Sequence, residues 1–140
     1  MDADYILEWF RFADADLEAA EHLMGMPRLR NEIICFHCQQ SAEKNLKGYL
    51  VYHGITEPPR THELDKLCAM CAAYDTRFLQ IKRACDVLTR YGVQPRYPHE
   101  IEVTEHTMKK ALEYARTIQD FALLQAARRE LEEALTNAKN

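Results

Sequence analysis

The sequence predicts an all-α protein, an antiparallel up-and-down bundle of four long helices and one short helix. Three observations lead to this prediction. Apolar residues recur at steps of three and four in successive segments, the spacing that places side chains on one face of a helix. Only 4 glycines and 5 prolines occur in 140 residues, too few turn residues for a many-stranded sandwich or barrel. Apolar residues make up 47% and charged residues 29%, which is typical of one folded domain.

The first two helices are expected over residues 4–25 and 30–52. Gly25 and Pro27 end the first helix, and Gly54 ends the second. The apolar face of the first helix consists of Ile6, Phe10, Ala13, Leu17, Ala20 and Met24, and that of the second consists of Cys35, Cys38, Ala42, Leu46 and Tyr49.

Three further helices follow an extended connection at Pro58 and Pro59. We expect a short helix over residues 62–73 with Thr61 as its N-cap, and a fourth helix over residues 76–90. The last helix is expected to start near Val103, with Thr104 as its cap, after an irregular stretch from Tyr91 to His99. We assign residues 1–125 to the bundle and residues 126–140 to a C-terminal helical extension or tail.

Charge and cysteine content narrow the class of protein. The formal net charge is -4, so no overall basic field favours nucleic acid. No apolar run is long enough to span a membrane, and the acidic start Met1–Asp4 does not resemble a signal peptide. Five cysteines, an odd number, suit reduced thiols better than a disulfide framework. These features predict a cytoplasmic protein with no membrane contact.

Two Cys-x-x-Cys pairs raise the question of a zinc site. The pairs are Cys35 with Cys38 and Cys68 with Cys71. Four thiolates can bind zinc, but such ligands usually lie on knuckles or loop ends, whereas both pairs here lie within predicted helices. Cysteine on an apolar helix face behaves as a small buried hydrophobe. We therefore expect no metal and no cofactor.

A polar stripe on the second helix is the first candidate site. His37, Gln40, Lys44 and Lys47 follow one another at steps of three, four and three, which places them within an arc of roughly 80°. The two ammonium groups supply charge and the imidazole and amide supply hydrogen-bond donors, a set that suits an anion. Glu43 lies beside the stripe and can hold a lysine in position. The alternative is a solvated face with Glu–Lys support within the helix.

The run from Phe36 to Leu50, FHCQQSAEKNLKGYL, resembles the signature helix of the HEPN (higher eukaryotes and prokaryotes nucleotide-binding) family. Two further segments, Thr61-His62-Glu63-Leu64 and Arg96-Tyr97-Pro98, resemble other family motifs in the same order, and the match covers about residues 5 to 125. The resemblance, to small prokaryotic stand-alone members, implies a helical bundle that is commonly a homodimer. Such proteins are often encoded beside a minimal nucleotidyltransferase in toxin–antitoxin pairs.

The resemblance also implies a nucleotide or phosphate site. Lys44, Lys47, His62 and Arg96 match polar positions of the family and can surround one anion if their segments meet. Arg96 would supply a bidentate fork for phosphate, and Tyr97 can stack on a base or simply close the core. The alternative is structural: Arg96 pairs with Glu43, and His62 caps a turn.

Many HEPN proteins are ribonucleases with an Arg-x(4–6)-His motif near their last helices. In that region Arg96 and His99 are too close together, and Arg90 and His99 are too far apart. Arg30 and His37 have the right spacing, but this pair starts the second helix instead. The motif is therefore not found where the family has it, which argues against an enzyme.

The first functional hypothesis is therefore a non-catalytic module that binds a nucleotide or a nucleotidyltransferase partner. The alternatives are a metal-independent RNase toxin, which would bind RNA, and a structural interaction domain without a ligand. We also predict a homodimer with the first or last helix at the two-fold axis, because the last helix leaves an apolar face to cover.

Overall fold

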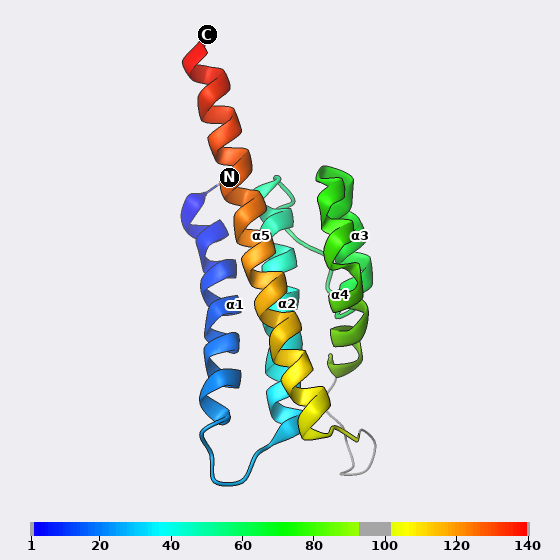
Figure 1. The fold of residues 1–140 in the computed structure, drawn as a ribbon. Coiled ribbons are helices and arrows are strands. Elements are labelled where there is room, and N and C mark those ends of the chain that lie inside the picture. The colour runs from blue at the N-terminus through cyan, green and yellow to red at the C-terminus, as the bar shows by residue number, and fades with distance from the viewer. Residues whose placement is uncertain (1, 93–101, 140) are drawn as a thin grey trace.

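The computed structural model describes residues 2–92 and 102–139, and all regular structure in them is helical (Figure 1). The α-helices are α1 (Ala3–Leu23), α2 (Asn31–Tyr52), α3 (Leu64–Tyr74), α4 (Lys82–Leu88) and α5 (Glu105–Lys139), and the 3-10 helices are η1 (Thr76–Ile81) and η2 (Thr89–Tyr91). The predicted all-α class is confirmed.

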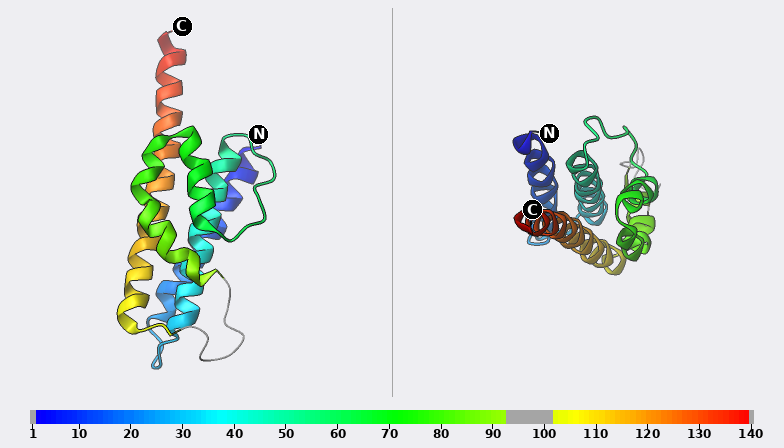
Figure 2. Two further views of the ribbon diagram at one scale, coloured as in Figure 1. Left: turned by 90° about the vertical axis from the view of Figure 1, so that its right-hand side faces the viewer. Right: turned by 90° about the horizontal axis from the view of Figure 1, so that it is seen from above.

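The helices form an up-and-down bundle around α2. Helix α1 runs antiparallel to α2, and α5 lies across both, while α3 and α4 form a hairpin on the other side of α2 (Figures 1 and 2). In the end-on view of Figure 2, α2 lies between α1 and the α3–α4 hairpin. Helix α2 is therefore in contact with most of the molecule, and its side chains meet groups from several other elements.

The core follows the predicted apolar faces. The largest side chains with no exposed surface come from α2, α3, η1, α4 and α5, namely Ile34, Leu46, Tyr49, Leu50, Leu64, Leu67, Phe78, Leu88, Met108 and Ile118. Each such side chain contributes about 1.5–3 kcal/mol through burial. Helix α2 is unusual because buried polar residues accompany its apolar ones: Gln39, Ser41, Glu43, Asn45 and Lys47 are all at most 7% exposed. Polar groups that are buried need partners, so this helix is the natural place to look for a site.

Two predicted boundaries differ from the structure. Thr61 is not the N-cap of the short helix: α3 begins at Leu64, with Glu63 in the cap position. The Thr61 hydroxyl instead accepts a hydrogen bond from the Glu63 amide at 3.1 Å, which makes a local turn before the helix. The segment predicted as one fourth helix is divided into η1, α4 and η2. Asp75 starts it by accepting a 3.0 Å bond from the Arg77 amide.

The last helix starts as predicted and continues to Lys139. Thr104 caps it by accepting a bond from the Thr107 amide at 3.1 Å. Figure 1 shows the C-terminal turns of α5 projecting beyond the ends of the other helices. Leu131 and Leu135 on this part are 62% and 56% exposed. Within the described residues, no helix combines the length and the apolar character that crossing a bilayer requires.

Candidate functional site

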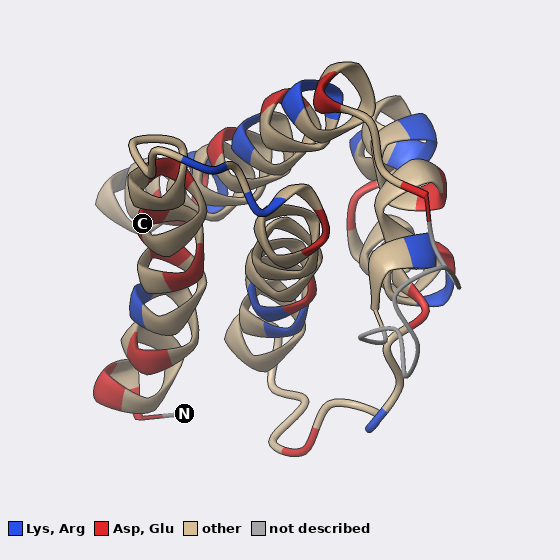
Figure 3. Ribbon diagram, turned by 90° about the horizontal axis from the view of Figure 1, so that it is seen from below, with Lys and Arg blue, Asp and Glu red and all other residues tan. Residues whose placement is uncertain are grey.

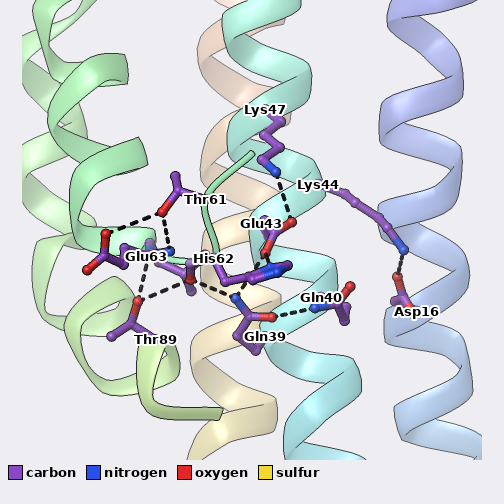
Figure 4. A network of polar contacts seen from close by, with 11 residues as sticks. Asp16, Gln39, Gln40, Glu43, Lys44, Lys47, Thr61, His62, Glu63 and Thr89 are labelled. Atoms are coloured by element: carbon purple, nitrogen blue, oxygen red, sulfur yellow. Dashed lines mark hydrogen bonds and ion pairs between the residues drawn. The ribbon is translucent and has the colours of Figure 1, made fainter. Parts of the chain in front are cut away.

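The structure divides the predicted polar stripe into two adjacent clusters, each built around one carboxylate. We call them the Glu43 cluster (Gln39, Gln40, Glu43, Lys47 and His62) and the Asp16 cluster (Asp16, His37 and Lys44). Figure 4 shows the two lysines pointing in different directions: Lys47 lies along α2 toward Glu43 of the same helix, and Lys44 reaches across to Asp16 on α1.

Glu43 is the centre of its cluster. Its carboxylate accepts hydrogen bonds from Lys47 Nζ at 3.0 Å and from Gln39 Nε2 at 3.2 Å, and it contacts His62 Nδ1 at 2.7 Å (Figure 4). Burial alone would raise the pKa of Glu43, but hydrogen bonds from His62, Lys47 and Gln39 outweigh burial and leave the pKa below its ordinary value. The carboxylate is therefore ionised, and because it can only accept, His62 Nδ1 carries the proton of this contact.

Gln39 fixes the backbone that carries His62. Its amide nitrogen donates to the His62 carbonyl at 3.0 Å as well as to Glu43, and its oxygen accepts from Gln40 at 2.7 Å. Thr89 completes the arrangement, because its hydroxyl accepts from the Leu64 amide at 2.6 Å and lies 3.4 Å from the His62 carbonyl (Figure 4). The turn before α3 is thus attached to both α2 and η2.

Gly92 itself packs against the same cluster. A Cβ at this position would lie only 3.2 Å from Gln39 Nε2 and 3.2 Å from His62 Cβ, closer than side chains normally pack. Glycine therefore permits the backbone at this position to lie directly against Gln39 and His62. Arg96 and Tyr97, both predicted site residues, lie outside the described residues; Arg96 follows Gly92 by four positions, which an extended chain spans in at most about 14 Å.

Asp16 is the functional candidate that the sequence reasoning missed. It accepts a hydrogen bond from Lys44 Nζ, and its other oxygen lies 3.0 Å from His37 Nδ1. Periodicity alone places Asp16 on the polar side of the first helix with other acidic residues. Its position directly before Leu17, which is buried, is a signal that it borders the core. Only the tertiary contact with α2 distinguishes it from its acidic neighbours.

The accessibility of the basic groups differs. The His62 side chain is 59% exposed and that of Lys44 is 29% exposed, whereas that of Lys47 is only 9% exposed. The prediction that Glu43 holds a lysine in position agrees with the Lys47 contact. Lys47, His62 and Gln40 are brought together around Glu43, while Lys44 and His37 belong to the neighbouring cluster. A ligand approaching from solvent would meet Lys44 and His62 before Lys47.

Arg30 and His37, the pair with ribonuclease spacing, form no hydrogen bond or ion pair with each other in the described structure. Arg30 precedes the first turn of α2 and is exposed, and His37 lies about two turns farther along the helix and contacts Asp16. Seven residues of helix correspond to about 10 Å along the axis. Because seven residues are close to two full turns, the two residues lie on the same side of α2, and their ribonuclease role stays a prediction.

The five cysteines are buried and carry free thiols. Cys68 donates to the Phe78 carbonyl at 3.3 Å, and Cys71 donates to the Leu46 carbonyl at 3.5 Å. Burial raises the pKa of Cys35 to about 12. In the part of the chain that the structure describes, no three His, Cys, Asp or Glu residues are grouped as metal ligands. The thiols act as packing groups, as expected for cysteines on apolar helix faces.

Charged residues of both signs are interspersed over the described helices, and Figure 3 shows no helix that is basic along its whole length. Neither cluster is strongly basic, because each carboxylate offsets one lysine. Recognition of an extended nucleic-acid backbone, which requires many cations in a row, is not supported by this surface.

Comparisons with known proteins agree with the fold. The profile of the HEPN domain matches residues 6–130. The crystal structure of TT1696 from Thermus thermophilus is 26% identical, with a TM-score of 0.72, over 84% of this chain and 94% of that chain. The structure of ST0689, an archaeal HEPN homologue, is 25% identical, with a TM-score of 0.68, over 86% of this chain and 97% of that one. A search of curated proteins gave no significant match. With its family motifs on α2, at the turn before α3 and after η2, the chain belongs to the HEPN family.

Proposed function

We propose that the protein is a non-catalytic HEPN-type binding module that holds the phosphate of a nucleotide at the Glu43 and Asp16 clusters. The observation that supports this most directly is the pairing of Asp16 and Glu43, each with one lysine and one histidine, on neighbouring parts of α2. The two carboxylates hold four basic side chains in position before any ligand arrives.

The hydrogen-bonding capacity of these groups is only partly used. An ammonium group has three donors, and Lys44 directs one of them to Asp16. His62 contacts Glu43 through Nδ1 and is exposed elsewhere on its ring, so that Nε2 faces no protein partner among the described residues. Phosphate accepts several bonds at once and would use these remaining donors.

Charge balance makes the chain after Gly92 important for this proposal. At neutral pH the two lysines offset the two carboxylates, so the clusters alone offer little net attraction for an anion. Arg96 would add the missing positive charge and a bidentate fork. It follows Gly92, which lies against His62, by four positions. Tyr97 beside it would provide a surface for a base.

The partner part of the proposal rests on the family resemblance. A nucleotidyltransferase transfers a nucleotide, so a module that binds nucleotide phosphate and a nucleotidyltransferase partner would recognise related chemistry. We propose that the two proteins work as a toxin–antitoxin-like pair. The corresponding test is co-purification of this chain with a nucleotidyltransferase encoded beside it. If the two proteins do not associate when they are co-expressed, the proposed pairing is contradicted.

The nucleotide part is tested by calorimetry with ATP and AMP on the wild type and on a Lys44→Ala/His62→Ala variant. These two residues are the accessible members of the clusters, so their removal should weaken binding by about tenfold or more. Lys82→Ala/Lys109→Ala, which removes two exposed lysines from other surfaces, is the control and should bind as the wild type does. Absence of binding to the wild type at millimolar nucleotide would contradict the proposal.

A further inference from the structure

A cavity lies away from both clusters, and residues between 125 and 132 of α5 form one of its sides. This part of α5 leads into the turns that project beyond the bundle in Figure 1. The cavity has a volume of about 430 Å³ and is bordered by the C-terminal ends of α2 and α3, the start of η1, and α5. Its lining includes Tyr49, His53, Tyr74, Arg77, Gln125 and Arg128. The size is within the range of small-molecule sites. No member of the Glu43 or Asp16 cluster lines it, so it needs an explanation of its own.

We propose that this cavity, which we call the α5 cavity, binds a compact organic anion in which a phosphate or carboxylate is attached to a planar ring. The oxyanion would be held by arginine, and the ring would lie against the exposed part of Tyr74. This site is independent of the proposed nucleotide site on α2.

The cations of the α5 cavity come from η1 and α5 but are not equally engaged. Arg77 is paired with Asp75 at 3.0 Å, and Arg129 is paired with Glu133 at 3.0 Å. Arg128 is exposed and forms no ion pair within the described residues. Its guanidinium is therefore the one that is free to receive an incoming anion.

Two carboxylates also line the cavity, Asp75 and Glu132. Glu132 lies one helical turn after Arg128. An incoming anion would therefore compete with the Glu132 carboxylate for the Arg128 guanidinium. Asp75 and Glu133 offset Arg77 and Arg129, so the attraction of this cavity for an anion depends on Arg128. A guanidinium group binds phosphate or carboxylate in a bidentate manner, which makes Arg128 selective for oxyanions.

An aromatic surface adjoins these cations. The rings of His53 and Tyr74 are stacked, with centroids 4.2 Å apart and planes at 18°. Tyr74 nevertheless remains 47% exposed. The stack fixes the orientation of Tyr74. A second planar ring can therefore pack on its remaining surface, and little side-chain entropy of Tyr74 is lost on binding.

The protonation of His53 follows from its contact with Arg129. Arg129 donates to His53 Nδ1 at 2.9 Å, and because a guanidinium has only donors, Nδ1 must be the unprotonated nitrogen. Burial lowers the pKa of His53, and the charge of Arg129 lowers it further, which keeps the ring neutral with its proton on Nε2.

Two buried polar atoms of lining residues have no hydrogen-bond partner in the described structure. They are His53 Nε2, a donor, and Gln125 Oε1, an acceptor on a side chain that is only 3% exposed. Such atoms normally have partners, and leaving them without one is costly. Each of these atoms has less than 1 Å² of its own surface exposed, so a ligand would satisfy them only if the lining side chains shifted on binding.

The test uses four probes in NMR titrations of the full chain: phenyl phosphate, benzoate, methyl phosphate and phenol. Phenyl phosphate and benzoate carry both features, and they distinguish phosphate from carboxylate as the preferred anion. Methyl phosphate lacks the ring and phenol lacks the charge. We expect at least one of the first two to bind about tenfold more tightly than methyl phosphate or phenol. The shifted signals should include the Gln125 side-chain amide.

Two variants separate the contribution of the arginine charge to binding from that of the aromatic ring. Arg128→Gln should weaken binding of the ring-bearing anion about tenfold, and Tyr74→Leu should reduce its affinity to that of methyl phosphate. Arg83→Gln, which removes an exposed arginine from α4, is the matched control and should bind as the wild type does. Light scattering on each variant checks that its assembly state is unchanged.

The outcome also separates this inference from the nucleotide proposal. Shifts of the Gln39 and Gln40 side-chain amides, with none at Gln125, would place the probe on α2 and overturn the inference. So would binding that survives Arg128→Gln but is lost in Lys44→Ala/His62→Ala. Lack of any saturable shift at millimolar phenyl phosphate and benzoate would overturn it without affecting the proposed function.

Discussion

His62 places its Nδ1 2.7 Å from Oε1 of Glu43, a residue 19 positions earlier in the chain. This contact joins the turn before α3 to the middle of α2, and Lys47 occupies the other oxygen of the same carboxylate. One buried carboxylate therefore determines where two basic side chains lie. Glu43 matters for stability because Lys47 and His62 would lose their charged hydrogen-bond partner without it.

Glu43→Gln should destabilise the protein. The substitution removes the negative charge but keeps the size, so Lys47, which is only 7% exposed, would remain buried without a counter-charge. Breaking a buried ion pair from one side typically costs about 3 kcal/mol or more. Urea denaturation followed by circular dichroism measures the loss. Glu113→Gln, on an exposed part of α5, should leave the midpoint almost unchanged, and equal midpoints for the two variants would contradict the role given to Glu43.

The stability of the wild type should depend on pH through the same residue. The folded-state pKa of Glu43 is lowered, so folding favours the ionised form. The contribution is therefore complete above the ordinary glutamate pKa of about 4.3 and is lost as the pH falls through the lowered value. The difference in unfolding free energy between wild type and Glu43→Gln should shrink in this acidic range. A difference that stays constant from neutral to acidic pH would exclude this linkage.

The titration of His53 does not change the difference in unfolding free energy between the two proteins. Its pKa is also lowered in the folded protein, so it too stabilises above its unfolded value, about 6.5, and loses this effect as the pH falls. Because both proteins contain His53, its contribution cancels in the difference. The sign of the remaining pH dependence is then set by Glu43.

Local periodicity predicts α1, α2 and α5 closely, but neither the division of the segment from η1 to η2 nor the contacts between helices. The apolar faces of α1 and α2 and the cap at Thr104 depend on neighbours three or four residues away, which the sequence shows directly. The role of Glu43 toward Lys47 was also a local, one-turn relation.

Tertiary contacts account for what was missed. Asp16 looks like any other acidic residue of α1 until α2 is placed beside it. The turn at Thr61 shortened α3 because Gln39 and Thr89, distant in sequence, hold the His62 backbone outside the helix. The α5 cavity combines the ends of α2 and α3 with η1 and α5, and no single segment contains its pattern.

The cysteine thiols should be unreactive in the folded protein. All five are buried, and burial raises the pKa of Cys35, to about 12, and that of Cys71, which leaves little of the reactive thiolate at neutral pH. A hydrogen bond with Cys85 lowers the pKa of Cys68, but this residue is only 1% exposed, so its burial protects it from reagents in solution. We expect slow labelling by iodoacetamide under native conditions and rapid labelling of all five thiols in urea. We also predict no stoichiometric zinc. One zinc per chain by elemental analysis, lost on Cys35→Ser/Cys68→Ser, would contradict the packing role.

The last prediction concerns self-association through α5. Leu124, Leu131 and Leu135 are 53%, 62% and 56% exposed, and their steps of seven and four match the seam of a coiled coil. Two of the three lie where α5 projects beyond the bundle, and water-exposed leucines in a row favour pairing with a second copy. We therefore expect a homodimer with α5 at the two-fold axis. The alternative within the same prediction is α1, where Phe12 is 59% exposed.

Light scattering after size exclusion distinguishes these arrangements. Leu131→Ser/Leu135→Ser should shift the protein from a dimer to a species of 16.3 kDa, whereas Leu79→Ser, a similarly exposed leucine on η1, should leave the dimer intact. Dissociation by Phe12→Ser instead would place α1 at the axis. Because Leu131 and Leu135 lie on the projecting part of α5, their substitution should cost little folding stability, so loss of the dimer would reflect the interface itself. A wild type that stays at monomer mass at every concentration would contradict the predicted homodimer.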